Sequence, residues 1–318
     1  VVEALTRRAE PAQAFHIEEI QDQVELALMR GGYHQVARAY VLYREERARE
    51  RAEAATAETE ATPAQLSTIR ADGERVAIDL VRLETVIQEA CHGLEGTDPG
   101  AVLDETMRNL FDGIGASELA QAPILAARTF VEQEPAYARV CARLLLDRLR
   151  REALTCISGV SRQATHRELA DSYDEYFTGY IQYGIDVGQI DPELAAFDLE
   201  HLGAALKPER DLQFEFLGLQ TLYDRYFLHE EGTRFELPQA FFIRVAMGLA
   251  VREIDREDRA IQFYELLSSF DFMSSTPTLF NAGTRRPQLS SCFLTTIADE
   301  LDGIFKSIRD NALLAKYS

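Results

Sequence analysis

The sequence predicts a mainly helical protein that contains one small β-hairpin and ends in an α/β segment. Three observations carry this prediction. Apolar residues recur at helical spacing over most of the chain, an Asp-Gly pair at 72–73 separates two short β-prone segments, and a β-prone stretch at 291–297 precedes a final helical pattern. With 318 residues, of which 46% are hydrophobic, the chain is long enough for one large or two to three small domains.

The charge balance excludes several classes of partner. Asp and Glu number 53 against 33 Lys and Arg, a net charge of −20. This argues against general affinity for nucleic acid or an anionic membrane, so any anionic ligand must be bound locally. Arg244 interrupts the most apolar stretch, so no membrane helix is expected. The four cysteines show no CxxC pair, which suits a reducing cytosol.

The first third of the chain predicts two similar units. Helical spacing between residues 17 and 51, broken by a Gly-Gly pair, predicts an α-hairpin, and a charged run closing with Pro63 predicts a linker. The segment from Tyr33 is similar to the one from Tyr137, which suggests that an earlier copy of the following domain ends here. Because the chain begins without Met and ends in a helical pattern, we expect both ends to be cut from a longer protein.

The remaining elements follow in order. The Asp-Gly pair predicts a hairpin between Ile69 and Ile78. Helical patterns then predict helices over 80–90, 101–114, 117–132 and 137–151, and an almost wholly helical stretch over 165–270. After Asp271, a Pro-, Gly- and Ser-containing loop is expected to lead into a strand over 291–297 and a helix over 299–316.

Few residues offer chemistry by themselves. Dinucleotide-binding, P-loop and metalloprotease motifs are absent, and the six histidines lack metal-ligand spacing, so no metal site is expected. Cys292 differs, because it follows two serines whose hydroxyls and backbone N–H groups could hold a phosphate beside its thiol. Thr276 precedes Pro277 and is expected to be extended. The alternative is a Ser-rich turn before a buried strand cysteine.

These residues form a pattern that resembles a known family. The stretch STPTLFNAGTRRPQLSSCFL is similar to the first barrel strand and its preceding loop in the large subunit of class I ribonucleoside-diphosphate reductase. Upstream, KPERDLQFEFLGLQTLYDRYFL and LPQAFFIRVAMGLA resemble the helical domain before that barrel. The resemblance implies the C-terminal part of a first ATP-cone over 1–55, a linker over 56–66, a second ATP-cone over 67–158, a helical domain over 159–272, and the truncated start of an α/β barrel over 273–318.

The resemblance also implies roles for single residues. Cys292 matches one of two cysteines that reduce the substrate and become a disulfide. Thr276 and Ser291 match residues that hold the substrate diphosphate, while Asp299 and Lys316 match residues at the specificity effector.

The second cone departs from the family pattern. Arg70 and Arg82 match basic positions for the cone nucleotide, but the family's Lys-Arg-Asp-Gly turn reads Arg-Ala-Asp-Gly here, which removes one charge from the phosphate site. This cone therefore either binds nucleotide or serves packing and oligomerisation.

For the whole protein, the resemblance implies reduction of ribonucleoside diphosphates to 2′-deoxyribonucleoside diphosphates by radical chemistry. Its implied partners are a radical-generating small (beta) subunit that carries the metal, thioredoxin or glutaredoxin, and further copies of itself in a homo-oligomer. ATP or dATP and deoxynucleoside triphosphates are the implied effectors, and the cytoplasm is the implied location. The family's radical cysteine and second redox cysteine lie beyond the residues given, so we expect this chain alone to be inactive.

Two other interpretations remain open. A cobalamin-dependent (class II) reductase shares the barrel and its Ser-Ser-Cys strand. A non-catalytic nucleotide-sensing or interaction module would share the cones and helices, but it has no need for that strand.

Overall fold

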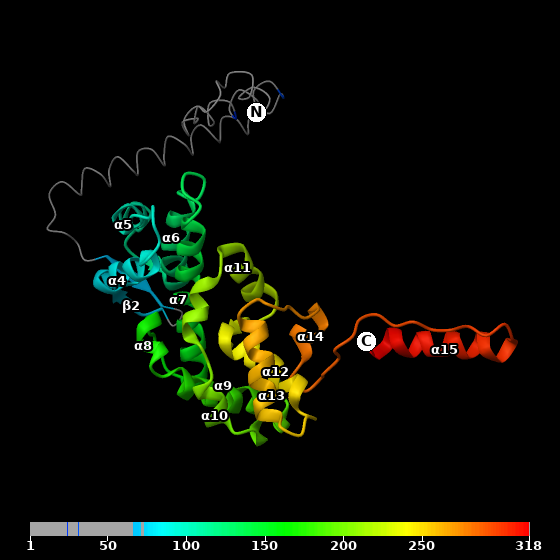
Figure 1. Cartoon of the computed structure of the whole chain (residues 1–318). Coiled ribbons are helices and arrows are strands. Elements are labelled where there is room, and N and C mark those ends of the chain that lie inside the picture. Colours follow the sequence, from blue (N-terminus) through cyan, green and yellow to red (C-terminus); the bar gives the residue numbers. More distant parts are fainter. Residues whose placement is uncertain (1–23, 25–30, 32–65, 71–72, 318) are drawn as a thin grey trace, which may run out of the picture. The chain divides into compact units, whose positions relative to one another are not determined.

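The computed structural model describes residues 66–70 and 73–317, together with residues 24 and 31 (Figure 1). The predicted N-terminal α-hairpin, the implied first cone, nearly all of the linker and the Ala-Asp pair at 71–72 lie outside the described residues. From residue 66 onward the chain forms one compact unit.

A small three-stranded sheet opens this unit. Strand β1 (Ser67–Ile69) pairs antiparallel with β2 (Arg75–Ala77), and the connecting turn contains Gly73 at φ +84°. This confirms the predicted hairpin. Strand β3 (Ile114–Gly115) lies parallel to β1 on its other side, in the order β2-β1-β3.

Strand β3 corrects the helix predicted over 101–114. Helix α5 (Pro99–Arg108) ends six residues earlier than expected. Gly113 adopts φ +81°, a left-handed conformation that glycine accepts readily, and its N–H donates to Ser67 O at 2.8 Å. The backbone after α5 is thereby drawn into the sheet.

Four helices complete the first part of the unit. They are α4 (Leu80–Cys91), α5, α6 (Ala116–Arg128) and α7 (Tyr137–Ser158). Asp79 and Asp98 begin α4 and α5 by accepting backbone N–H bonds from Arg82 and Gly100. Helix α7 extends seven residues past the predicted end and is closed by Gly159 at φ +70°. Its buried face contacts α4, α6 and α11.

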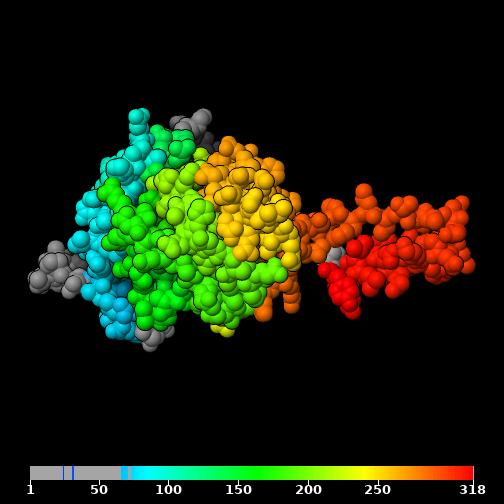
Figure 2. Space-filling view, turned by 60° about the horizontal axis from the view of Figure 1, so that its bottom comes forward, coloured from blue at the N-terminus to red at the C-terminus, as the bar shows by residue number. Residues whose placement is uncertain are grey.

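The following stretch is helical, as predicted. Its elements are α8 (His166–Ala170), α9 (Tyr173–Asp186), η1 (Pro192–Ala196), α10 (Leu199–Ala204), η2 (Pro208–Gln213), α11 (Phe216–Arg225), the short strands β4 (His229–Glu230) and β5 (Thr233–Arg234), α12 (Pro238–Ala250) and α13 (Arg256–Ser268). One cluster of buried apolar side chains runs from α4 through α7 to α12 and α13. In the space-filling view, the green to yellow segments that contain α7 to α13 form one continuous packed body (Figure 2).

The strand predicted over 291–297 does not form. After α14 (Thr276–Asn281), residues 290–298 have exposed side chains and no strand pairing, and Leu294 is fully exposed. A strand needs a neighbour for its backbone hydrogen bonds, and none of the described strands supplies one here. The predicted final helix is confirmed as α15 (Leu301–Tyr317). The start of a barrel therefore stays a prediction.

None of the described helices is both long and apolar enough to cross a membrane.

Candidate functional site

The candidate site is built around α14 and the segment that follows it. Ser275 is extended and precedes the helix, and Pro277 falls in the first turn, where a missing N–H costs no helical hydrogen bond. Thr276 is therefore the first residue of a helix, which corrects the extended conformation expected before proline. Its N–H still lies outside the helical hydrogen-bond ladder, because it belongs to the first turn.

Two side chains of α14 hold the segment that leads to the cysteine. Asn281 Nδ2 donates to Gln288 O at 2.7 Å, and Thr278 Oγ1 donates to Leu289 O at 3.4 Å. These contacts stop just before the Ser-Ser-Cys sequence at 290–292. The position of its first residues is thus tied to α14.

A fully buried ion pair in the helical core holds α14 in place. Arg244 on α12 and Glu236 are both 0% exposed, with Nε and Oε1 2.7 Å apart. Arg244 also donates from Nη1 to Ala282 O at 2.6 Å and from Nη2 to Leu279 O at 3.3 Å. One buried cation therefore binds the carbonyl groups at the end of α14.

Three groups donate hydrogen bonds to the Glu236 carboxylate. Besides Arg244, Tyr180 donates from its hydroxyl to Oε1 at 2.5 Å, and the Leu228 N–H donates to Oε2 at 2.9 Å. Burial by itself lowers the pKa of Arg244, but Glu236 and Tyr180 more than offset this and the pKa is raised. The guanidinium stays charged in the core.

Two glycines allow α12 and the end of α14 to approach closely. A Cβ added at Gly248 would lie 2.0 Å from Gly283 N, and Gly283 itself adopts φ +74°. No larger residue fits at Gly248 without moving one of the two backbones. The close contact and the Arg244 bonds together fix α14 on the helical core.

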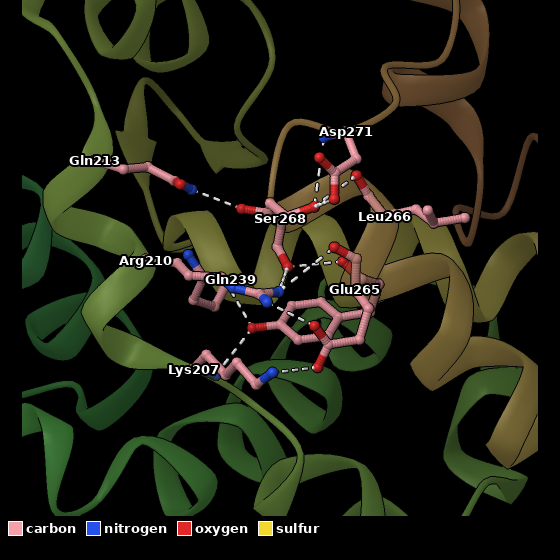
Figure 3. Close-up of polar contacts among 10 residues, drawn as sticks. Lys207, Arg210, Gln213, Gln239, Glu265, Leu266, Ser268 and Asp271 are labelled. Atoms are coloured by element: carbon pink, nitrogen blue, oxygen red, sulfur yellow. Dashed lines mark hydrogen bonds and ion pairs between the residues drawn. The ribbon is translucent and has the colours of Figure 1, made fainter.

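The segment that enters α14 is held by a polar network between η2 and α13 (Figure 3). Arg210 donates to Ser268 Oγ at 2.5 Å and pairs with Glu265 at 2.6 Å, while Lys207 Nζ lies 2.6 Å from the other oxygen of Glu265. Gln213 Nε2 donates to Ser268 O at 2.6 Å. Because α13 ends at this serine, the network fixes where the chain leaves for the site.

Of the predicted substrate residues, Thr276 lies on α14, whereas Ser291 follows the anchored segment. Thr276 Oγ1 is 3.2 Å from the hydroxyl of Tyr226, whose ring stacks on Phe280 with centroids 4.4 Å apart. Ser291 Oγ is 4.0 Å from Cys292 Sγ, and both residues are exposed. No hydrogen bond joins Thr276 to Ser291 among the described residues. Cys292 is a free, exposed cysteine and not the buried strand residue of the alternative interpretation.

The two predicted effector residues are not brought together. Asp299 is exposed just before α15, and Lys316 is exposed in its last turn with Nζ 5.2 Å from the centre of the Tyr317 ring. At 1.5 Å rise per residue, about 22 Å of helix lies between its first residue, Leu301, and Lys316.

Both predicted cone arginines have acidic partners. Arg70 pairs with Glu74 at 2.6 Å on the surface. Arg82 pairs with Asp147 of α7 at 2.9 Å, and each side chain is 18% exposed. Arg82 thus links α4 to α7 in this structure, which favours a packing role.

The sequence reasoning missed the residues that support the site, chiefly Arg244, Glu236 and Tyr226. One signal was available, since the single charged residue of a mainly apolar 13-residue helix must find a buried partner. No group of three or more His, Cys, Asp or Glu side chains in the described part of the chain could hold a metal ion.

Comparison with known proteins gives two family matches. The ATP cone domain matches residues 1–49, and the all-alpha domain of ribonucleotide reductase matches residues 212–287. The second region contains α11 to α14, including Arg244, Glu236 and the close contact between Gly248 and Gly283.

Curated relatives match over more of the chain. The ribonucleoside-diphosphate reductase subunit alpha of Chlamydia muridarum is 42% identical over 100% of this chain and 30% of its own length. That of Chlamydia trachomatis is 44% identical over 95% of this chain and 29% of its own length. The large subunit of Danio rerio is 30% identical over 78% of this chain and 30% of its own length.

The chain thus spans about 30% of the length of these relatives. With its two domain matches and an alignment that covers its whole length, the chain belongs to the family of ribonucleoside-diphosphate reductase large (alpha) subunits.

Proposed function

We propose that this chain is the part of a ribonucleoside-diphosphate reductase alpha subunit that supplies one redox cysteine, Cys292, and binds effector nucleotides. The observation that supports it most is the alignment of the whole chain with alpha subunits, together with a free, exposed Cys292 that follows a firmly anchored α14. A buried structural cysteine would not lie at such a position.

The proposed reaction replaces the 2′ hydroxyl of a ribonucleoside diphosphate by hydrogen. Two thiols, those of Cys292 and of a partner cysteine elsewhere in the alpha subunit, supply two electrons and two protons and become a disulfide. The hydroxyl leaves as water. An external dithiol protein, thioredoxin or glutaredoxin, then reduces the disulfide by thiol exchange. A small subunit that carries a metal centre starts the radical chemistry.

The hydroxyls of Thr276 and Ser291 are proposed to hold the diphosphate. Thr276 lies at the first turn of α14, whose free backbone N–H groups and helix dipole favour a negative charge. Its hydroxyl already contacts another hydroxyl, that of Tyr226, rather than a carboxylate. It can therefore donate to a phosphate without breaking an ion pair.

Asp299 and Lys316 remain the proposed residues of the specificity effector. Because they lie at opposite ends of α15, a single nucleotide would contact both only across two copies of the chain. The geometry therefore links this assignment to the proposed homo-oligomer.

For the second cone, over 67–158, we propose packing as its main role. The match to an ATP cone at residues 1–49 supports nucleotide effector binding by the chain. In the second cone, however, Arg82 is held by Asp147. Calorimetric titration with dATP and dTTP separates the two roles. Tight dATP binding that Arg82→Ala abolishes would show that this cone binds nucleotide.

The names of the relatives favour this function over a cobalamin-dependent reductase. They are called subunit alpha or large subunit, which describes an enzyme of more than one kind of chain.

The test uses the complete alpha subunit assembled with its small subunit. Cys292→Ser should abolish multiple-turnover reduction of CDP with thioredoxin as reductant, because serine cannot form the disulfide. The control is Cys156→Ser, since Cys156 is partly buried and its Sγ contacts the Tyr183 hydroxyl at 3.1 Å, away from α14. Full turnover by the Cys292 variant would refute the assignment.

A further inference from the structure

A basic pocket lies between the first helices of the compact unit and the helical stretch that follows. It is formed by α4, α7, α8 and η2, has a cavity volume of about 70 Å³ and is partly open to solvent. Its charged and titratable lining residues are Glu89, His92, Arg143, Arg150, His166 and Arg167. None of the residues proposed above for substrate or effector nucleotides lines it.

Two of its arginines are held by backbone carbonyl groups. Arg143 Nη1 donates to Ala90 O at 3.0 Å and to His92 O at 2.8 Å, at the end of α4. Its Nε is buried and has no hydrogen-bond partner within the part of the chain that the structure describes. Arg150 is 4% exposed and donates from Nε to Ala164 O at 3.2 Å. These contacts fix two cations without neutralising them.

The acidic residues nearby neutralise this charge only in part. Glu89 Oε1 is 4.0 Å from Nε of Arg167, the outer limit of an ion pair. Asp147 is 3.5 Å from Arg150 but only 2.9 Å from Arg82, which lies outside the pocket. It is therefore shared between two cations.

The positive charges of the pocket also affect the pKa of His166. Burial is the largest cause that lowers the pKa of this imidazole to about 4. The charges of Arg150 and Arg143 lower it further, Glu209 opposes the shift, and Arg167 adds a smaller lowering. Nearby, burial raises the pKa of Asp211 to about 7, so this carboxyl group carries only part of a negative charge at neutral pH. A chain with net charge −20 thus keeps a locally cationic pocket.

We propose that this basic pocket binds a phosphate group, through the guanidinium groups of Arg143, Arg150 and Arg167. Planar guanidinium groups are the side chains best suited to phosphate oxygens. The remaining wall is aliphatic, from Val86, Ala90 and Leu212, and no phenyl or phenol ring lines the pocket among the described residues. Its recognition chemistry therefore comes mainly from the arginine charges, beside the imidazole rings of His92 and His166. The ligand is inorganic phosphate or the phosphate end of a nucleotide.

A bound phosphate would connect two parts of the compact unit. Arg143 and Arg150 belong to α7, whereas His166 and Arg167 belong to α8. Leu212 lies where the match to the all-alpha domain begins. Binding should therefore stabilise the contact between these parts. The inference does not depend on reductase activity and can be tested without it.

The test follows the His166 imidazole by NMR in the intact chain, titrated with inorganic phosphate or with ATP. Sodium chloride at matched ionic strength is the reference for general screening. Phosphate should raise the pKa of His166 by about one unit, equivalent to roughly tenfold coupling between protonation and binding. A shift with phosphate identifies the free ion as ligand, and a shift with ATP alone identifies a nucleotide phosphate. Both results support a phosphate site.

Variants separate this site from nonspecific binding. Arg167→Ala is the main variant, because its side chain is 69% exposed and its loss should leave the fold intact. Arg143→Gln is the second, with folding checked by circular dichroism. Each should weaken phosphate binding at least tenfold. Arg252→Ala, a side chain 83% exposed outside the pocket, should change nothing. The proposal fails if His166 responds equally to chloride, responds to neither ligand, or responds normally in both pocket variants.

Discussion

Arg244 is the residue on which the support of α14 depends most. Replacing it by Met removes the donor to Ala282 O and leaves Glu236 buried without its cation. Leaving one member of a buried pair unpaired costs about 3–5 kcal/mol. Arg244→Met should therefore lower the free energy of unfolding by that amount, as measured by chemical denaturation.

The double variant Arg244→Met, Glu236→Leu is the control for this prediction. It removes both charges, so the penalty for a lone buried carboxylate disappears and part of the stability should return. If the double variant is no more stable than Arg244→Met, the loss does not arise from the unpaired charge.

Asp211 predicts a pH dependence of stability. It is completely buried and accepts a hydrogen bond from Gln239 Nε2 at 2.8 Å, and burial raises its pKa from 3.8 to about 7. Between these values the unfolded chain releases the proton while the folded chain keeps it, so ionisation favours unfolding. The contribution of Asp211 to stability is thus complete below pH 4, falls as the pH rises towards 7, and then levels off.

Asp211→Asn isolates this effect, because the amide cannot ionise and keeps an oxygen for Gln239. The melting temperature of the unaltered chain, relative to the variant, should fall between pH 5 and about pH 7. Asp224→Asn, at an exposed position on α11, should leave the pH profile unchanged. Parallel profiles for the chain and its Asp211→Asn variant would show that this carboxyl group is already ionised at pH 5.

At the scale of single residues, the sequence indicated candidate site residues but not the buried residues that hold α14 in place. Cys292, Thr276 and Ser291 could be proposed as site residues because they lie in one contiguous motif, and this assignment stays a prediction. Arg244 and Glu236 could not be paired, since no local pattern shows which buried groups meet. Arg82 was assigned because it matches a basic position of the family's cone, and its partner Asp147 lies 65 residues away.

Helix α12 offers the clearest test at the scale of elements. A Cβ at Gly248 would lie 2.0 Å from Gly283 N and 2.6 Å from Ala282 C, both backbone atoms that cannot rotate away. Gly248→Ala should therefore displace the end of α14 and destabilise the protein by about 1–3 kcal/mol, despite the better helix propensity of alanine.

Gly218→Ala on α11 is the matched control, because nothing lies within 4 Å of its added Cβ. It should stabilise the protein by up to about 1 kcal/mol through helix propensity alone. Equal effects of the two substitutions in chemical denaturation would show that α12 and α14 do not approach as closely as described.

Helices and strands could be predicted from the sequence where neighbouring residues alone determine them. The hairpin of β1 and β2 followed from its Asp-Gly turn, and long helices such as α7 followed from apolar spacing. Strand β3 has only two residues and forms because it pairs with β1, far away in sequence, so no local pattern could show it. The strand predicted over 291–297 does not form, because residues with high β propensity still need a neighbouring strand for their backbone hydrogen bonds.

At the scale of the whole molecule, the chain combines a segment that matches an ATP cone domain with one that matches the all-alpha domain of ribonucleotide reductase. One cluster of buried apolar side chains extends from α4 to α14, whereas residues 290–298, which include Cys292, have exposed side chains and lie outside it. Because the implied radical cysteine lies outside the chain of 318 residues, this chain should show no CDP reduction by itself. Product formation by this chain with a small subunit would contradict that expectation.

The measurement that tests the central claim most directly is alkylation of Cys292 after a single turnover. The complete alpha subunit, fully reduced and assembled with its small subunit, is given CDP without an external dithiol, alkylated, and analysed by mass spectrometry. We predict that Cys292 becomes protected in proportion to dCDP formed, while Cys156 is labelled equally with and without CDP. If dCDP forms while Cys292 remains as open to alkylation as before, Cys292 is not the reductant.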